Sequence, residues 1–128
     1  LVVSADDGLD EISIAARTRV IEVRNGGTEE WFIEPEELGL EVAPLETVAG
    51  GTPEENAAVI RGVLEGKDQG PAREVCLLNA GATIFVAGKA DGLADGVERG
   101  REAIDSGEAL RVLDRLVEVT RDLAASDS

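Results

Sequence analysis

The sequence predicts an α/β fold in which a strand and a β-hairpin precede about four helices. Three observations support this class. Apolar and polar residues alternate on both sides of a strong turn signal near residue 26, helix-capping signals recur after residue 51, and 43% of the residues are apolar. A chain of 128 residues is the size of one domain, or of part of a larger one. Because aromatic residues are scarce, aliphatic side chains must fill the core.

The chain begins with a short apolar segment followed by an acidic loop. Residues 1–3 indicate the end of a buried strand, for which the local pattern supplies no partner. Residues 4–11 are polar and place Gly8 at the turn. The chain contains no methionine and opens at Leu1 with a strand that lacks a neighbour, so we expect it to be part of a longer protein.

The next segment predicts a β-hairpin. Residues 17–24 and 29–34 alternate in polarity around Asn25-Gly26-Gly27, which is a combination typical of a tight turn. Pro35 should end the second strand, because proline cannot donate a backbone hydrogen bond to the ladder. Residues 36–48 show no clear period, and we expect a loop there with room for one helical turn.

The first helix has the clearest start signal. Thr52 can cap its N-terminus, Pro53 fits the first helical position, and Glu55 completes the spacing of a capping box. The helix should run to about residue 64 and stop at Gly66. Its apolar face is expected to carry Ala57, Ile60 and Leu64.

Three more helices are expected after it. Residues 70–88 are apolar on nearly all sides and predict the central buried helix. Residues 92–106 predict a third helix, weakened by Gly96 and Gly100. The fourth should run from about residue 106 to about residue 123, after which the chain should fray. Its helical spacing is carried by Leu110, Leu113, Val117 and Thr120.

The composition excludes several function classes. A formal net charge of −15 repels phosphate backbones and argues against nucleic-acid binding. The best apolar stretch, residues 75–87, is shorter than the ~20 residues that a membrane span needs. With no histidine, a Ser-His-Asp triad, a Cys-His pair and a His-bearing zinc site are excluded within this chain. The excess of acid with few lysines predicts adaptation to high salt, where ions screen the self-repulsion.

Several residues in and before the helices favour structural roles. Cys76 lies in an apolar run and is expected to pack as a small hydrophobic residue. Asn79 should be hydrogen-bonded to backbone or to another helix, and Arg73 should form an ion pair. Gly50-Gly51 could cradle an anion before a helix N-terminus, but an ordinary helix cap is favoured.

The acidic loop is the candidate for chemistry. Asp6, Asp7, Asp10 and Glu11 fall within six positions directly after the first strand, and in open α/β sheets ligands collect at the carboxyl ends of strands. Magnesium typically takes one or two carboxylates and completes its shell with water and phosphate oxygens, a pattern that adjacent Asp10 and Glu11 fit. Spacing alone favours a solvated acidic turn, so both interpretations stay open at this point.

The order of several motifs resembles the anthranilate phosphoribosyltransferase family. Asp7-Gly8-Leu9-Asp10-Glu11-Ile12-Ser13 resembles its metal-binding loop, and Gly70-Pro71-Ala72-Arg73-Glu74 with Leu77-Leu78-Asn79-Ala80 resembles its buried helix. The match continues with Val86-Ala87-Gly88-Lys89-Ala90, Ala103-Ile104-Asp105-Ser106-Gly107 and, in the earlier helix, Asn56-Ala57. Each motif is weak alone, but together they cover nearly the whole chain in order. The resemblance is to the C-terminal part of the family.

That resemblance implies that residues 1–128 are the C-terminal part of one nucleoside phosphorylase/phosphoribosyltransferase-type α/β domain. It implies a cytoplasmic enzyme of tryptophan biosynthesis, paired as a homodimer through a separate helical domain. This enzyme would transfer the phosphoribosyl group of phosphoribosyl pyrophosphate to the amine of anthranilate. Two Mg²⁺ ions would hold the pyrophosphate, with the family's Asp-Glu pair mapping onto Asp10 and Glu11 and with Glu11 as the bridge between the metals.

Two departures from the family affect what this chain should do alone. Ser4-Ala5 stands where the family usually has His-Gly. The family's glycine-rich phosphate-binding loop and its anthranilate-binding residues fall before Leu1, so we expect the 128 residues alone to be inactive. Two alternatives stay open: a related phosphoribosyltransferase or pyrimidine nucleoside phosphorylase-like enzyme, and a non-enzymatic acidic metal-binding or interaction module.

Overall fold

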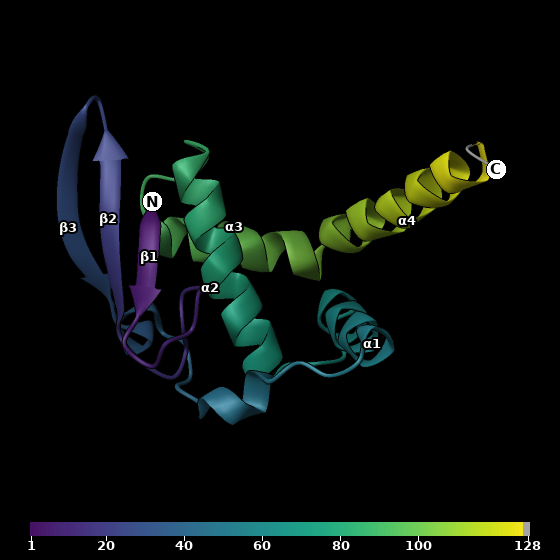
Figure 1. Ribbon diagram of the computed structural model, residues 1–128, viewed down its shortest axis with the longest axis horizontal. Coiled ribbons are helices and arrows are strands. Elements are labelled where there is room, and N and C mark those ends of the chain that lie inside the picture. Colours follow the sequence, from purple (N-terminus) through teal and green to yellow (C-terminus); the bar gives the residue numbers. More distant parts are fainter. Residues whose placement is uncertain (127–128) are drawn as a thin grey trace.

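A three-stranded antiparallel sheet and four α-helices make up the computed structural model, which describes residues 1–126 (Figure 1). The strands β1 (Val2–Ala5), β2 (Thr18–Arg24) and β3 (Gly27–Ile33) lie in that order in the sheet. Asn25 and Gly26 join β2 to β3 with φ angles of 52° and 78°, the left-handed conformation that a tight hairpin turn requires. The predicted fold class and the predicted hairpin are both confirmed.

The first strand has a partner that the local pattern does not reveal. β1 pairs antiparallel with β2, placing Val3 opposite Val20. The expectation of a buried strand without a neighbour is therefore wrong, and Val2 is 64% exposed. A long loop separates the two paired strands in the sequence. The alternation of apolar and polar residues within one strand does not indicate which distant strand will pair with it. The rule that ligands bind beyond the carboxyl ends of strands applies to open, mostly parallel α/β sheets. Because the observed strand pairs are antiparallel, that rule does not by itself support ligand binding at the acidic loop.

Two short 3-10 helices connect the sheet to the helical part. They are η1 (Pro35–Leu38) and η2 (Leu45–Val48), where the sequence predicted a loop with room for one turn. Gly39 follows η1 with φ of 70°, so the chain reverses there. The connection is partly anchored, since Leu40 and Ala43 are buried in the core.

The first helix, α1 (Pro53–Leu64), begins as predicted but buries a different residue. The Thr52 side chain accepts a hydrogen bond from Glu55 N while Glu55 Oε2 accepts one from Thr52 N, which completes the capping box. Val63 is the buried residue of the helix, whereas Ile60 is 53% exposed. The expected apolar face is wrong for Ala57 and Ile60, which are exposed, whereas Leu64 is half-buried and packs against the core as predicted.

The central pair of helices crosses at glycines. α2 (Pro71–Val86) packs on α3 (Leu93–Asp105), and a Cβ added at Gly96 would collide with the carbonyl oxygen of Gly81. A Cβ at Gly81 would lie 2.7 Å from Val97 N, also too close. Glycine was expected to weaken α3, but here it permits the closest approach of the two backbones.

A single core joins the sheet, the loop after β1 and the helices α2 and α3. Its most completely buried aliphatic residues are Ile14, Val20, Leu77 and Leu78. The prediction that the second helix is buried is confirmed for the face that carries Leu77 and Leu78, although Val86 at its C-terminus is exposed. The core therefore fixes the acidic loop directly against α2.

The last helix, α4 (Glu108–Ser126), extends away from this core (Figure 1). It continues through residues 124–126, which were expected to fray, while Asp127 and Ser128 lie outside the described residues. No residue of α4 is buried, and Leu113 and Val117 are half-buried on its inner side. Among residues 1–126, none of the helices combines the length and the apolar character that crossing a membrane requires.

Candidate metal site at the acidic loop

The acidic loop leaves β1 through a tight turn. Gly8 N donates to the carbonyl oxygen of Ala5 at 3.1 Å, and Gly8 adopts φ of 91°, which disfavours any residue with a side chain. Asp6 N donates to Arg17 O at 2.9 Å, and the Asp6 carboxylate pairs with the Arg17 side chain at 3.0 Å. The two ends of the loop are thereby held together.

Asp7 organises the inside of the loop. Its Oδ1 accepts a hydrogen bond from Leu9 N at 3.0 Å, and its Oδ2 accepts one from Ser13 Oγ at 2.6 Å. The Ser13 hydroxyl, followed by the Leu9 amide, lowers the pKa of the Asp7 carboxyl below its ordinary value. Ser13 itself is fully buried. Asp7 is thus occupied as a structural acceptor, in contrast to the next two acids of the loop.

Asn79 fixes the loop from the side of α2. Its Oδ1 accepts a hydrogen bond from Ile12 N at 3.0 Å, while its Nδ2 donates to Ile12 O at 2.9 Å and to Val75 O at 3.0 Å. The predicted structural role of Asn79 is confirmed. Because Ile12 follows Glu11 directly, this contact sets the backbone position of the neighbouring carboxylate.

Asp10 and Glu11 are the free carboxylates of the loop. Both are exposed, and neither accepts a hydrogen bond or forms an ion pair with another of the described residues. Buried Ile12 and Ile14 follow them and anchor the loop in the core. The sequence singled out these two residues as metal ligands, and the structure presents them on an anchored backbone with open oxygen atoms.

The carboxylates of Asp10 and Glu11 fit a hard cation whose remaining ligands are not side chains of this loop. Among residues 1–126 no cluster of three or more His, Cys, Asp or Glu side chains could enclose a metal ion. Two adjacent carboxylates without further protein ligands match magnesium, which keeps several water or phosphate oxygens in its shell. If the loop binds magnesium, these two carboxylates would supply one side of the site, and the remaining ligands would have to come from outside the loop.

A cleft that the sequence did not indicate opens beside Glu11. It has a volume of about 770 Å³ and lies between α1, η2 and α2. Glu11 and Asn79 line it together with apolar side chains of α1, including Val59 and Val63. No local signal could have located it, because it exists only through the way α1 packs on α2.

Cys76 lies in the wall of this cleft, in surroundings that disfavour its thiolate. Burial raises the pKa of its thiol, and this effect outweighs the lowering influence of Arg73. A thiol whose pKa is raised stays protonated near neutral pH. Its expected packing role is supported, although the side chain is half-buried rather than fully enclosed.

The glycine pair leads directly into the Thr52 cap of α1 and is tied to the helix through Asn56. Gly51 N donates to Asn56 Oδ1 at 2.8 Å, and Asn56 Nδ2 donates back to Gly51 O at 3.3 Å. Thr52 N is occupied by Glu55. These amides already have acceptors, so the cap interpretation is confirmed over the anion cradle.

Comparison with known proteins places the chain in a family. A family model described as "Glycosyl transferase family, a/b domain" matches residues 1–110. The chain belongs to this family.

Several relatives of this glycosyl transferase domain are named anthranilate phosphoribosyltransferase. The chain is 53% identical over 130 residues to an anthranilate phosphoribosyltransferase of Thermomicrobium roseum, and the match covers 99% of this chain and 37% of the relative. An anthranilate phosphoribosyltransferase structure from Thermus thermophilus superposes with a TM-score of 0.83 at 42% identity, over 93% of this chain and 35% of that one. An anthranilate phosphoribosyltransferase structure from Saccharomyces cerevisiae in complex with PRPP and Mg gives a TM-score of 0.82 at 30% identity. That match covers 91% of this chain and 33% of the other.

The resemblance found from the motifs is confirmed by these comparisons. The chain spans about 37% of the length of the curated relative that it matches at 53% identity. In this glycosyl transferase domain, motifs far apart in the sequence meet in space: buried Arg73 of α2 pairs with Asp105 at the end of α3, with 2.6 Å between Nη2 and Oδ1. The predicted ion pair of Arg73 is confirmed.

Proposed function

We propose that this chain supplies the metal-binding loop of a magnesium-dependent anthranilate phosphoribosyltransferase. Such an enzyme transfers phosphoribosyl from phosphoribosyl pyrophosphate to the amine of anthranilate, in tryptophan biosynthesis. The observation that carries the proposal is the 53% identity, over 99% of this chain, to a relative of that name. The anchored loop with its two free carboxylates supports it independently.

Asp10 and Glu11 hold the metals in this proposal. Their carboxylates face solvent, where magnesium can bring the oxygen atoms of a pyrophosphate group. Glu11 also lines the cleft beside α2, whereas Asp10 does not, so the two side chains serve different sides of the loop. By the family resemblance, Glu11 would be the residue that holds both ions. When bound, magnesium would neutralise the negative charge that develops on the departing pyrophosphate.

The proposed reaction needs no covalent bond between the substrate and this chain. The bond between the ribose anomeric carbon and the pyrophosphate oxygen breaks, and the oxygen keeps the electron pair. The anthranilate nitrogen forms the new bond to that carbon and gives up a proton. No protein nucleophile takes part, which agrees with the absence of histidine and with the protonated thiol of Cys76. Asn79 contributes by holding the loop rigid, so that the carboxylates need not reorganise.

The remaining parts of the activity belong to the same proposal. The phosphate-binding loop, the anthranilate-binding residues and the helical domain that pairs two subunits are assigned outside these 128 residues, with the cytoplasm as the location. The chain alone therefore has no measurable turnover. Detectable conversion of anthranilate by residues 1–128 would contradict this assignment.

A chimaeric enzyme tests the proposal. The matching C-terminal segment of the Thermomicrobium roseum relative is replaced by residues 1–128, and transfer to anthranilate is measured. The chimaera should be active, and Asp10→Asn with Glu11→Gln should lower kcat/KM on the order of 100-fold or more. Glu29→Gln, an exposed carboxylate on β3, is the matched control and should leave the rate unchanged. Near-normal turnover of the double variant would remove both residues from the metal site.

Metal titration separates the enzyme from a metal-binding module. In the chimaera, magnesium should bind weakly alone and more tightly when phosphoribosyl pyrophosphate is present, because phosphate oxygens complete its shell. The Asp10→Asn and Glu11→Gln changes should abolish that difference. Tight binding without phosphoribosyl pyrophosphate would instead favour the non-enzymatic module.

A further inference from the structure

The two candidate metal ligands lie between two backbone amides that side chains hold in place. Leu9 directly precedes the ligands and donates its N–H to Asp7 Oδ1 at 3.0 Å. Ile12 directly follows them and is held by the side-chain amide of Asn79. The direction in which the ligands leave the loop therefore depends on Asp7 at one end and on Asn79 at the other.

Asp7 is itself held from the interior of the domain. Ser13 Oγ donates to Asp7 Oδ2 at 2.6 Å and accepts a hydrogen bond from Ala15 N at 2.9 Å. Ser13 N donates to Thr18 Oγ1 at 3.1 Å, and both Ser13 and Thr18 are fully buried. Thr18 begins β2. A continuous series of hydrogen bonds therefore runs from the sheet through Ser13 and Asp7 to the amide of Leu9.

The charge of Asp7 is the feature that a packing role does not explain. An asparagine or a serine could also accept a hydrogen bond from the amide two residues ahead, without carrying a charge. Asp7 instead places a third carboxylate within four positions of the candidate ligands Asp10 and Glu11. Like charges at this spacing repel one another, and a bound cation offsets that repulsion. The arrangement is therefore unfavourable for the loop alone and favourable for a loop that binds a cation.

We propose that Asp7 and Ser13 are positioning residues for magnesium bound at the acidic loop. Both oxygen atoms of the Asp7 carboxylate already accept hydrogen bonds, so this residue supports the loop while Asp10 and Glu11 contact the ion. Partners of this kind restrict the ligands to one geometry, and their loss typically lowers metal affinity about 10–100-fold. The inference rests on the proposed function and adds two residues that act on the ion through the loop backbone.

A role of the Asp7 charge alone is the competing explanation, and Ser13 distinguishes it. Ser13→Ala removes the hydroxyl that holds Asp7 but changes no charge. Under the competing explanation this variant would bind magnesium as well as the natural chain does, whereas loss of positioning should weaken binding. Salt distinguishes the two explanations as well, because the Debye length falls from ~10 Å at 0.1 M to ~3 Å at 1 M. An effect of Asp7→Asn that persists in 1 M KCl is therefore an effect of position.

The chimaeric enzyme that contains residues 1–128 provides the test. At saturating phosphoribosyl pyrophosphate, the magnesium concentration for half-maximal rate should rise at least ~10-fold in Asp7→Asn and in Ser13→Ala. The rate at saturating magnesium should change much less, because the ligands of the ion are intact. The double variant should need no more magnesium than the weaker-binding single variant, since both changes break the same hydrogen bond.

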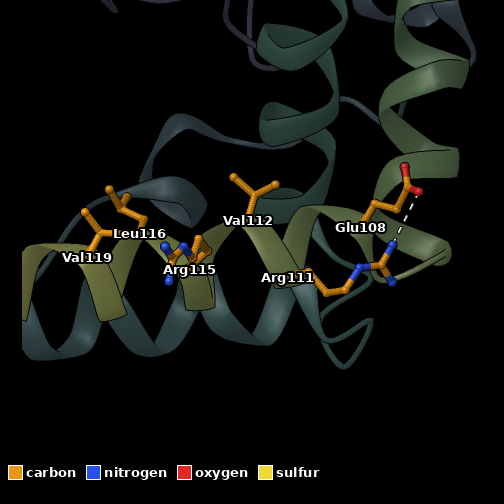
Figure 2. Close-up of a pocket in the computed structure, with 6 residues that line it drawn as sticks. All are labelled: Glu108, Arg111, Val112, Arg115, Leu116 and Val119. Atoms are coloured by element: carbon orange, nitrogen blue, oxygen red, sulfur yellow. Dashed lines mark hydrogen bonds and ion pairs between the residues drawn. The ribbon is translucent and has the colours of Figure 1, made fainter.

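Two exposed positions at the junction of α3 and α4 supply matched controls. Glu108→Gln removes one carboxylate charge, and Figure 2 shows this side chain paired with Arg111, at 3.3 Å. Ser106→Ala removes a hydroxyl that, like that of Ser13, accepts a hydrogen bond from a nearby backbone amide, here Glu108 N at 3.4 Å. Neither control should alter the magnesium requirement.

Circular dichroism should show that each variant is folded. Asp7 is exposed, so Asp7→Asn should fold even if Ser13→Ala, which alters a buried side chain, does not. In that event the comparison of Asp7→Asn with the natural sequence in 1 M KCl decides between position and charge.

The outcomes separate this inference from the proposed function. Unchanged magnesium requirements in Asp7→Asn and Ser13→Ala overturn the positioning role, as does an effect of Asp7→Asn that disappears in 1 M KCl. An equal loss of rate at every magnesium concentration also overturns it, because less folded enzyme would have that effect. In each of these cases, a requirement that still rises in Asp10→Asn leaves the proposed function intact. If Asp10→Asn leaves the requirement unchanged, the metal assignment itself fails, and the positioning role is rejected with it.

Discussion

Asn79 of α2 holds the backbone of Ile12 by two hydrogen bonds, one accepted by Oδ1 at 3.0 Å and one donated by Nδ2 at 2.9 Å. The two residues are 67 positions apart in the sequence. The side-chain amide of Asn79 makes the same pair of N–H···O bonds that two residues facing each other on antiparallel strands make. The residue before Ile12 is Glu11. The central helix thereby determines where the candidate metal ligands stand.

Replacing Asn79 by alanine should loosen the acidic loop. Ile12 would lose partners for its N–H and its carbonyl in a part-buried position, at a cost of about 1–3 kcal/mol. Urea unfolding measures the loss of stability, and amide hydrogen exchange should show faster exchange at Ile12 than at Val20 in β2. Unchanged protection of the Ile12 amide would mean that the core alone holds the loop. Thr28→Ala, at an exposed position in β3, is the control.

Gly96→Ala should destabilise the protein because α2 and α3 cross there. The new methyl group would press on the backbone of Gly81, and separating the helices would disturb the core, with a cost of about 1–3 kcal/mol or more. Gly62→Ala in α1 is the matched control, since its added Cβ would meet only Asp68 Cβ at 3.9 Å. That change should stabilise α1 by about 0.5–1 kcal/mol. Equal thermal shifts for the two variants would refute the close crossing.

Asp7 should make the stability depend on pH in the acidic range. The Ser13 hydroxyl lowers the pKa of this carboxyl in the folded chain, so its contribution is present above the ordinary pKa of an aspartate, near 3.8. It is lost as the pH falls through the lower folded pKa. The stability difference between the natural chain and Asp7→Asn should therefore shrink towards pH 2, as followed by urea unfolding. Ser13→Ala should reduce this pH dependence, and a constant difference from pH 6 to pH 2 would contradict it.

The surplus of acid should make the fold depend on salt. With a net charge of −15, self-repulsion in the compact state weakens as ions screen it. The melting temperature should rise between low and molar KCl in differential scanning calorimetry. Replacing exposed glutamates such as Glu36 and Glu37 by glutamine should raise the low-salt value and flatten the response. A melting temperature insensitive to KCl would count against salt adaptation.

Local chemistry made much of the fold predictable. The hairpin followed from Asn25-Gly26, because the turn needs φ angles that those residues adopt readily. The start of α1 followed from Thr52 and Glu55, whose side chains satisfy backbone groups within one turn. Such signals are contained within a few consecutive residues, so they need no knowledge of the rest of the molecule.

The candidate site was predictable in identity but not in geometry. Asp10 and Glu11 were singled out by their adjacency and by the motif that surrounds them, and their role as metal ligands remains a prediction. The cleft beside Glu11 was not foreseen, because its walls come from three separate elements. The distinction between Asp7, bound by Ser13, and its free neighbours also depends on how the loop closes.

By itself, the sequence determined the order and the approximate bounds of the strands and α-helices, which residues could bind a cation, and that histidine chemistry is absent from this chain. Only the tertiary structure decided what each face touches. It paired β1 with β2, buried Val63 in place of Ile60, and set Gly96 against Gly81. The physical reason is that periodicity reports that a face is apolar, whereas burial depends on which distant backbone approaches it.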